Sequence, residues 1–358
     1  RRPAGDTTKV VETINRKNIA DTDQDQAEPI EDAEALQRKQ AQQQQRAAQT
    51  ALSTQQALLD GLQELDLWIH DQLRTGILAF NKELRERTRR IASRMVDAKA
   101  TTLASRIDEL ASVVRDVPTE RQPELIVQEL GCWLLLSRAF QNNPLDLDAK
   151  RALCGAESRA TSPHNDLKSF HRQGRWLCIG EQITNRRDGL ISHSTYLWPL
   201  DAQPVADLHS AVLLQDFYPA STGKRHGSMR AGTILQAAVQ FYPSRWLQRA
   251  TLDDFQPLDE PLDSASIACG IDISQTFISA RQQLPWLEHV TGLVGPCQLF
   301  KEAAGPYWLK TNTGLLPLSQ HSFPAAAGGP LSNACVRWNG REAELLTAFS
   351  ATWGVIAC

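Results

Sequence analysis

The feature that most constrains the fold is an apolar stripe through residues 58–73. Leu58, Leu62, Leu65 and Ile69 recur at steps of three and four residues, which is the spacing of one face of an α-helix. Such a helix gains most of its stability by burying that face against other elements. The sequence therefore predicts a helix that packs into a larger assembly, with Trp68 as a buried anchor.

Two further apolar stripes follow at helical spacing, one over residues 84–98 and one over residues 103–114. In one continuous helix they would lie roughly 100° apart around the axis. We therefore predict a break near Lys99–Thr102, with Thr101 or Thr102 as the N-cap of a new helix.

A last helical pattern runs from about Glu124 to Phe140 and is stopped by Asn142-Asn143-Pro144. Together these stripes predict a helical bundle over residues 51–155. Residues 1–50 differ, since an acidic run is followed by a Gln-rich segment with almost no apolar stripe. We predict a disordered, low-complexity linker there, with an exposed helical lead-in toward Leu58.

The pattern changes to strands after about residue 162. Leu235, Ala237, Val239 and Phe241 alternate with more polar neighbours, and Pro243 ends the run. We predict an antiparallel β domain over residues 156–255 and a smaller β-rich or α+β domain over residues 256–358, with a helix near 273–290. The predicted fold class is α+β: an N-terminal helical bundle followed by mostly antiparallel β structure.

Composition limits the function classes. The chain has 358 residues, 42% hydrophobic content and a formal net charge of -3, so no global charge attracts nucleic acid or a basic partner. The sequence has no apolar run long enough to cross a membrane and begins without a signal peptide or Met, which suggests a fragment. Seven Cys at irregular spacing indicate reduced, mostly buried thiols in a cytoplasmic protein.

Three separated motifs carry a resemblance. Gly61 to Asp71 matches the pattern Gly-Leu-x-Glu-Leu-x-x-Trp-Leu-x-Asp except at Ile69. Ala92 to Ala104 matches Ala-Ala-Arg-Met-Val-Asp-Ala-Gln-Ala-Pro-Gly-Leu-Ala except at Ser93, Lys99 and Thr101-Thr102. Phe241-Tyr242-Pro243 closes a predicted strand. In this order the motifs resemble the region downstream of the zinc finger in bacterial SWIM-type zinc-finger family proteins, over about residues 58–250.

The resemblance implies zinc only for a finger upstream of Arg1. The family's finger has Cys-x-Cys followed by Cys-x-His, and this chain contains neither pattern. No zinc ligand, and no other cofactor, is therefore assigned within the chain. In the second motif Thr101-Thr102 stands where the family has Pro-Gly.

Sites of catalysis or metal binding are not indicated by spacing. Cys154, His164, His171 and Cys178 lie seven to ten residues apart, whereas structural zinc sites usually hold their ligands in close pairs. Neither Gly-x-Ser-x-Gly nor His-Glu-x-x-His occurs. We predict no catalytic, cofactor-binding or metal-binding residue.

One basic stretch remains. Residues 82–106 hold eight Lys or Arg against three acidic residues. In a helix, Lys82, Arg85 and Arg89 would lie opposite the apolar stripe and could contact phosphates or an acidic partner. A charged face opposite a core stripe is more often simply solvated, and Glu83 and Glu86 stand beside these cations, so we expect weak or no nucleic-acid binding near physiological salt.

We therefore predict a non-enzymatic binding or scaffold protein with an unidentified protein partner. By resemblance, it is the body of a SWIM-type protein whose upstream finger would contact nucleic acid or protein. Two alternatives stay open. One is a nucleic-acid-binding body that uses the basic helix 82–106, and the other is an enzyme whose site is assembled only in the fold.

Overall fold

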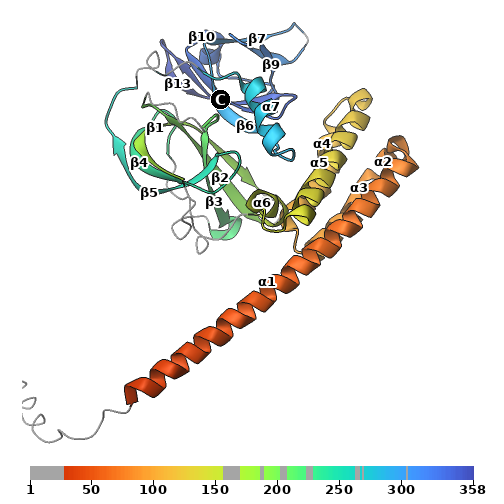
Figure 1. Cartoon of the computed structure of the whole chain (residues 1–358). Helices are drawn as coiled ribbons and strands as arrows, with labels where there is room; N and C mark the ends of the chain where they lie inside the picture. Colours follow the sequence, from red (N-terminus) through yellow and green to blue (C-terminus); the bar gives the residue numbers. More distant parts are fainter. Residues whose placement is uncertain are drawn as a thin grey trace, which may run out of the picture. The chain divides into compact units, whose positions relative to one another are not determined.

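The computed structural model describes residues 28–155, 170–185, 189–201, 208–222, 229–262, 267, 270–303 and 305–358, with only the backbone of residues 28–41, 44 and 222. Two compact units divide the chain, residues 1–57 and residues 58–358. The predicted fold class is confirmed, because a helical region is followed by mostly antiparallel β-sheets (Figure 1).

Helix α1 (Glu28–Thr75) begins in the first unit and ends in the second. Residues 1–27 of the predicted linker lie outside the described residues. From Glu28 onward the chain is helical, earlier than predicted, because Ala, Gln, Arg and Lys are strong helix formers even without an apolar face. The described side chains between Gln42 and Ser53 are exposed, as expected for the lead-in.

In the second unit the predicted stripe on α1 is buried, with Leu58, Leu62, Leu65 and Ile69 at most 2% exposed. The helices that follow α1 form the rest of the helical region: α2 (Ile77–Lys82), α3 (Leu84–Asp97), α4 (Thr101–Arg115), a 3-10 turn η1 (Thr119–Arg121), α5 (Gln122–Asn142) and α6 (Leu147–Cys154).

Trp68 is only half-buried, so its prediction as a buried anchor is wrong. It lies one residue from Ile69, at the margin of the stripe, and meets Phe80 edge-on with ring centroids 5.6 Å apart. The fully buried tryptophan of the bundle is Trp133 on α5, at 0% exposure.

The predicted break between α3 and α4 is confirmed. Lys99 adopts a left-handed conformation with φ 69. The N–H of Lys99 donates to the Val96 carbonyl and that of Ala100 to the Met95 carbonyl, the two hydrogen bonds of a Schellman motif. Ala100 and Met95 are both 0% exposed, which completes the motif with an apolar contact.

This turn also corrects the predicted N-cap. Ala100, and neither Thr101 nor Thr102, is the N-cap of α4, and it makes no side-chain capping bond. Because the Schellman turn fixes where the chain leaves α3, Thr101 falls inside the new helix. Its hydroxyl donates instead to the carbonyl of Cys154 at 3.2 Å, which ties α4 to the end of α6.

Gly61 is required where α1 crosses the end of α3. A Cβ at this position would lie 2.3 Å from the Cβ of Ala98, closer than two such atoms can approach. The glycine of the first sequence motif therefore meets the alanine of the second motif at a backbone contact between two helices.

Beyond the helical region, the first five strands close a barrel in the order β1-β2-β3-β5-β4. All neighbours are antiparallel except β3 and β5, which are parallel. The predicted alternation from Leu235 to Phe241 is confirmed, since its four apolar side chains are at most 2% exposed and belong to the core that includes Trp176 and Cys178. The strands are β1 (Phe170–Asn185), β2 (Leu190–Pro199), β3 (Val212–Pro219), β4 (Ile234–Phe241) and β5 (Arg249–Leu258), with a 3-10 turn η4 (Ala220–Thr222) after β3.

The remaining strands form two four-stranded sheets, β13-β12-β11-β6 and β10-β7-β8-β9. The predicted helix near 273–290 is α7 (Ile273–Gln283), which ends earlier than expected, just before Leu284-Pro285. The strands are β6 (Val290–Val294), β7 (Cys297–Lys301), β8 (Tyr307–Thr311), β9 (Leu315–Pro317), β10 (Pro330–Leu331), β11 (Asn333–Trp338), β12 (Ala343–Ser350) and β13 (Gly354–Ala357), with a 3-10 turn η5 (Ala325–Gly328) before β10.

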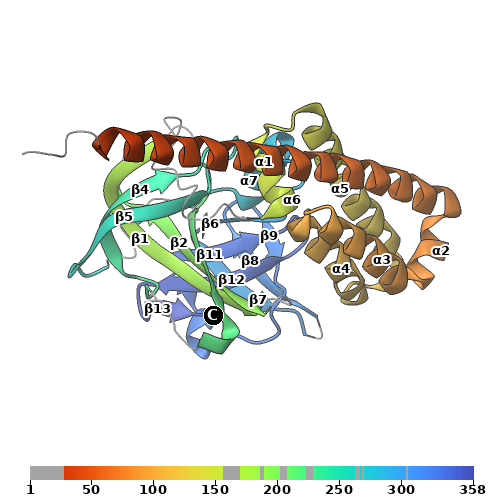
Figure 2. The same ribbon diagram turned by 90° about the horizontal axis from the view of Figure 1, so that it is seen from below.

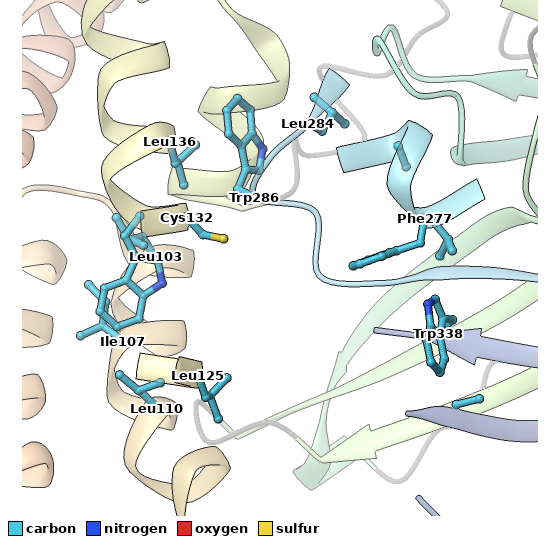
Figure 3. Close-up of a cluster of buried hydrophobic side chains, with 14 of the residues drawn as sticks. Leu103, Ile107, Leu110, Leu125, Cys132, Leu136, Phe277, Leu284, Trp286 and Trp338 are labelled. Carbon is cyan, nitrogen blue, oxygen red and sulfur yellow. The ribbon is translucent and has the colours of Figure 1, made fainter. Parts of the chain in front are cut away.

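Two apolar contacts join these parts of the second unit. Leu177 and Tyr196 of the barrel pack with Leu293 and Cys335 of the sheet that contains β6 and β11. Figure 2 shows β2 of the barrel beside β6 of that sheet. A larger core is shared by the helical region, α7 and both sheets. In Figure 3, Trp286, just after α7, lies beside Cys132 and Leu136 of α5.

Helix α6 also holds the connection between β4 and β5. Arg245 in this connection contacts Asp146 at 3.0 Å and Asp148 at 3.3 Å, at the start of α6. Arg151 donates to the carbonyl of Pro243 and lies over the ring of Tyr242, with its Cζ 5.7 Å from the centroid. The third sequence motif, Phe241-Tyr242-Pro243, is thus a contact between the barrel and the helical region.

We expect Trp133→Ala to lower the free energy of unfolding by about 3–5 kcal/mol, because it empties a fully enclosed space. Trp68→Ala should cost less than half as much, since that side chain is partly solvated already. Urea unfolding followed by circular dichroism measures both. Equal losses for the two variants would contradict this distribution of burial.

Asp148→Ala should lower the free energy of unfolding by about 2–4 kcal/mol. The substitution removes a carboxylate of which only 9% of the side chain is exposed, so Arg245 and Arg151 each lose an ion pair. The matched control is Asp71→Ala, whose pair with Arg74 is exposed and should contribute less than about 0.5 kcal/mol. The same unfolding measurement compares them, and a control loss as large as that of Asp148→Ala would refute the role of α6.

Candidate functional site

The structure separates the residues of the predicted basic helix 82–106. Lys82 is the last residue of α2, Glu83 interrupts the helix, and Arg85 and Arg89 lie one turn apart on α3. The basic stretch is therefore not one helix: the chain breaks at Glu83, which was not predicted, and at Ala98–Ala100, close to the predicted break. All three cationic side chains are nevertheless exposed.

Most other arginines of α3 have an acidic partner. Arg87 pairs with Glu83 and Arg90 with Glu86, both at 2.8 Å. Arg94 pairs with Glu64 of α1 at 3.3 Å. Within the part of the chain that the structure describes, Arg85 and Arg89 have no such partner, and the two glutamates expected to offset them are bound to other arginines.

Arg85 and Arg89 share a hollow of about 430 Å³ with Arg115 of α4. Arg115 is exposed and falls outside the basic stretch recognised in the sequence. The hollow, here called the arginine hollow, is lined by Arg85, Arg89, Asp108, Ala111, Ser112 and Arg115. Sequence reasoning could have found Arg115 from the short α3–α4 turn, which brings the end of α4 beside the start of α3.

A second cavity, of about 360 Å³, lies between the helical region and the C-terminal sheets. Four arginines, five glutamates and His289 line it, and they come from α4, α5, α7, the segment before β6 and the β11–β12 hairpin. We call it the charged cleft. It was not predicted, because its residues are far apart in the sequence.

Ion pairs occupy much of the charged cleft. Arg106 contacts Glu129 at 3.0 Å and Glu288 at 3.3 Å, and donates to the carbonyl of Trp286 at 2.9 Å. Burial lowers the pKa of Arg106, but the two glutamates outweigh this effect and raise it above its ordinary value. This arginine therefore links α4, α5 and the segment after α7.

On the other wall, Arg337 donates to Glu344 at 3.1 Å and to Nδ1 of His289 at 3.1 Å. A guanidinium can only donate, so Nδ1 accepts and the proton of the neutral ring is on Nε2. Burial, and then the nearby charges of Arg337 and Arg106, hold the pKa of His289 well below its ordinary value. The imidazole is therefore neutral at neutral pH and serves as a hydrogen-bond acceptor.

The described cysteines do not resemble nucleophiles. Cys132 accepts from Nη2 of Arg281 at 2.7 Å, yet burial raises the pKa of its thiol. Burial also raises the pKa of Cys178 and of Cys297 to about 12. A thiol reacts as the thiolate, so these groups are poorly suited to covalent catalysis near neutral pH.

The spaced Cys and His residues do not come together as a set. Cys154 ends α6, whereas His171 is exposed on β1 and Cys178 points into the barrel core. His164 lies outside the described residues. Among those that are described, no group of three or more potential ligands is placed to hold a metal ion. None of the described helices has the length and apolar character needed to span a membrane.

His289 should make stability depend on pH. Because its pKa is lowered in the folded state, the unfolded chain binds more protons below about pH 6.5, and stability falls as pH falls. His289→Gln keeps an acceptor for Arg337. In this variant the free energy of unfolding should fall less steeply below pH 6.5, by up to about 1.4 kcal/mol per pH unit. Unfolding free energies at neutral and mildly acidic pH test this, with His171→Gln as the exposed control. Identical pH slopes for His289→Gln and the unmodified chain would contradict it.

Comparison with known proteins gives a match to a family model. No curated protein and no solved structure matches the chain. Residues 53–153 match the family model described as the SWIM-associated four-helix bundle domain. The resemblance drawn from the first two motifs is confirmed over these residues, whereas Phe241-Tyr242-Pro243 lies beyond them and its part in the resemblance stays a prediction. The helical region of this chain, from the end of α1 to α6, is thus similar to the SWIM-associated four-helix bundle domain.

Proposed function

We propose that this chain is a non-enzymatic binding protein that contacts an acidic partner protein through the basic face of its helical region. This face consists of Lys82, Arg85, Arg89 and Arg115. The observation that carries the proposal is the unequal pairing on α3. Among the residues that the structure describes, none is an acidic partner of Arg85 or Arg89, whereas Arg87, Arg90 and Arg94 each have one.

The charged cleft supports the non-enzymatic part of the proposal. The imidazole of His289 already accepts from Arg337, and three of the five glutamates in the cleft, Glu129, Glu288 and Glu344, are bound to arginines. A general acid or base needs a group free to exchange a proton with a substrate near the working pH. These groups instead orient the facing side chains of the helical region and the sheets.

A second candidate function is nucleic-acid binding by the same face. It is favoured by the finding that Glu83 and Glu86 are bound to Arg87 and Arg90, so they offset the neighbouring cations less than the sequence indicated. The small number of converging cations favours an acidic protein over an extended polyphosphate backbone.

The test uses fluorescence anisotropy with two labelled probes, a peptide rich in Glu and Asp and a single-stranded oligonucleotide. We expect the acidic peptide to bind, and its affinity to fall as salt screens the exposed charges. Lys82→Glu/Arg85→Glu/Arg89→Glu should abolish this binding. The matched control, Arg74→Glu/Lys150→Glu/Lys310→Glu, makes the same charge change at exposed positions elsewhere and should retain it.

The outcomes separate the candidates. Oligonucleotide binding with a log–log salt slope of about -2 to -3, lost in the first variant and kept in the second, would make nucleic acid the ligand. Equal losses in both triple variants would show that only overall charge matters, and would overturn the assignment of this face.

A further inference from the structure

We propose that the arginine hollow binds the dianion of a phosphate monoester through Arg85, Arg89 and Arg115. This inference rests on the proposed function, because it names the chemical group by which the basic face recognises its partner.

The three arginines converge from two helices. Arg85 and Arg89 are four residues apart on α3, and Ser112 and Arg115 are three residues apart on α4, so each pair lies on one helix face. The Schellman turn at Lys99 makes α3 and α4 antiparallel neighbours, which brings the last turn of α4 beside the first turns of α3. The hollow is thus built by the fixed geometry of a helical hairpin and not by mobile loops.

Such a cluster costs stability in the absence of a ligand. Like charges one helical turn apart repel each other. Arg115 is favoured in the last turn of α4 by the helix dipole, but Arg85 stands at the second position of α3, where a positive charge opposes the dipole. Solvation alone is a sufficient reason for one arginine to be exposed. It gives no reason for three arginines to line the same hollow.

The charge of the hollow fits a monoester better than a diester. Asp108 offsets one of the three guanidinium charges, which leaves about two positive charges within the lining. A phosphate monoester carries about -1.5 to -2 at pH 7, whereas each diester of a nucleic-acid backbone carries about -1. Guanidinium groups also bind phosphate oxygens in a bidentate manner, which a lysine ammonium cannot do.

The test compares three short labelled peptides of one sequence that carry phosphoserine, Glu or Ser at the central position. We expect the phosphoserine peptide to bind at least about tenfold more tightly than the Glu peptide. Its affinity should fall as pH drops from about 7 to about 5, because the monoester takes up a proton with a pKa near 6 while guanidinium groups stay charged. The Glu peptide should lack this dependence around pH 6.

The informative variant is Arg115→Lys, which keeps the charge and should still weaken phosphoserine binding about tenfold by removing the bidentate contact. Arg89→Lys is a second variant of the same kind, and circular dichroism checks that both fold. The control is Arg90→Gln on the same helix, which pairs with Glu86 and does not line the hollow. It should leave phosphoserine binding unchanged.

Free O-phosphoserine serves as a competitor and distinguishes the sources of the monoester. Competition at concentrations similar to the peptide indicates a small phosphorylated molecule, and much weaker competition indicates a phosphorylated protein; both support the inference. Equal binding of the Glu and phosphoserine peptides, or no effect of either Lys variant, would overturn the inference of a phosphate monoester. The proposed function, binding of an acidic partner protein, would then still stand. If none of the charged peptides binds, the proposed function fails as well.

Discussion

Burial of one apolar core shared by the helical region, α7 and the C-terminal sheets is the interaction on which the rest of the structure depends. A fully buried Leu or Phe side chain stabilises the fold by about 1.5–3 kcal/mol, whereas an exposed ion pair contributes about 0–1 kcal/mol. Contacts such as that of Trp286 with α5 therefore set the distance between helices and sheets. The ion pairs of Arg106 and Arg337 form because this packing brings their elements together, and they orient the walls more than they hold them.

Local features of the sequence predicted the local features of the fold. The stripe from Leu58 to Ile69 and the alternation from Leu235 to Phe241 follow the periods of a helix and a strand, so burial could be inferred without knowing the partner elements. The closure of the barrel and the parallel pair β3–β5 could not, because strand pairing joins segments far apart in the chain.

The same distinction applies to the sites. Arg85 and Arg89 were recognised because they stand in a charged stretch, but Arg115 belongs to the hollow only through the register of the α3–α4 hairpin. The charged cleft draws on several distant segments and left no pattern in the sequence. Likewise Thr101 is a common type of N-cap, but the left-handed Lys99 placed the cap at Ala100. In the family pattern Pro stands at the position of Thr101, and a proline fits the first residue of a helix, where its missing N–H is not needed.

The contacts of α6 show that the segment matched by the family model differs from the structural unit that contains it. The family model ends at residue 153, just as α6 ends, which marks a segment that can recur in different proteins. Asp146, Asp148 and Arg151 on that helix nevertheless bind Arg245 and Pro243 from the barrel, and side chains of the bundle share a core with α7 and the sheets. A segment excised at this boundary would expose part of the shared apolar core to solvent. Asp146, Asp148 and Arg151 would also lose their partners Arg245 and Pro243. The segment that the family model matches is therefore smaller than the unit that shares one apolar core.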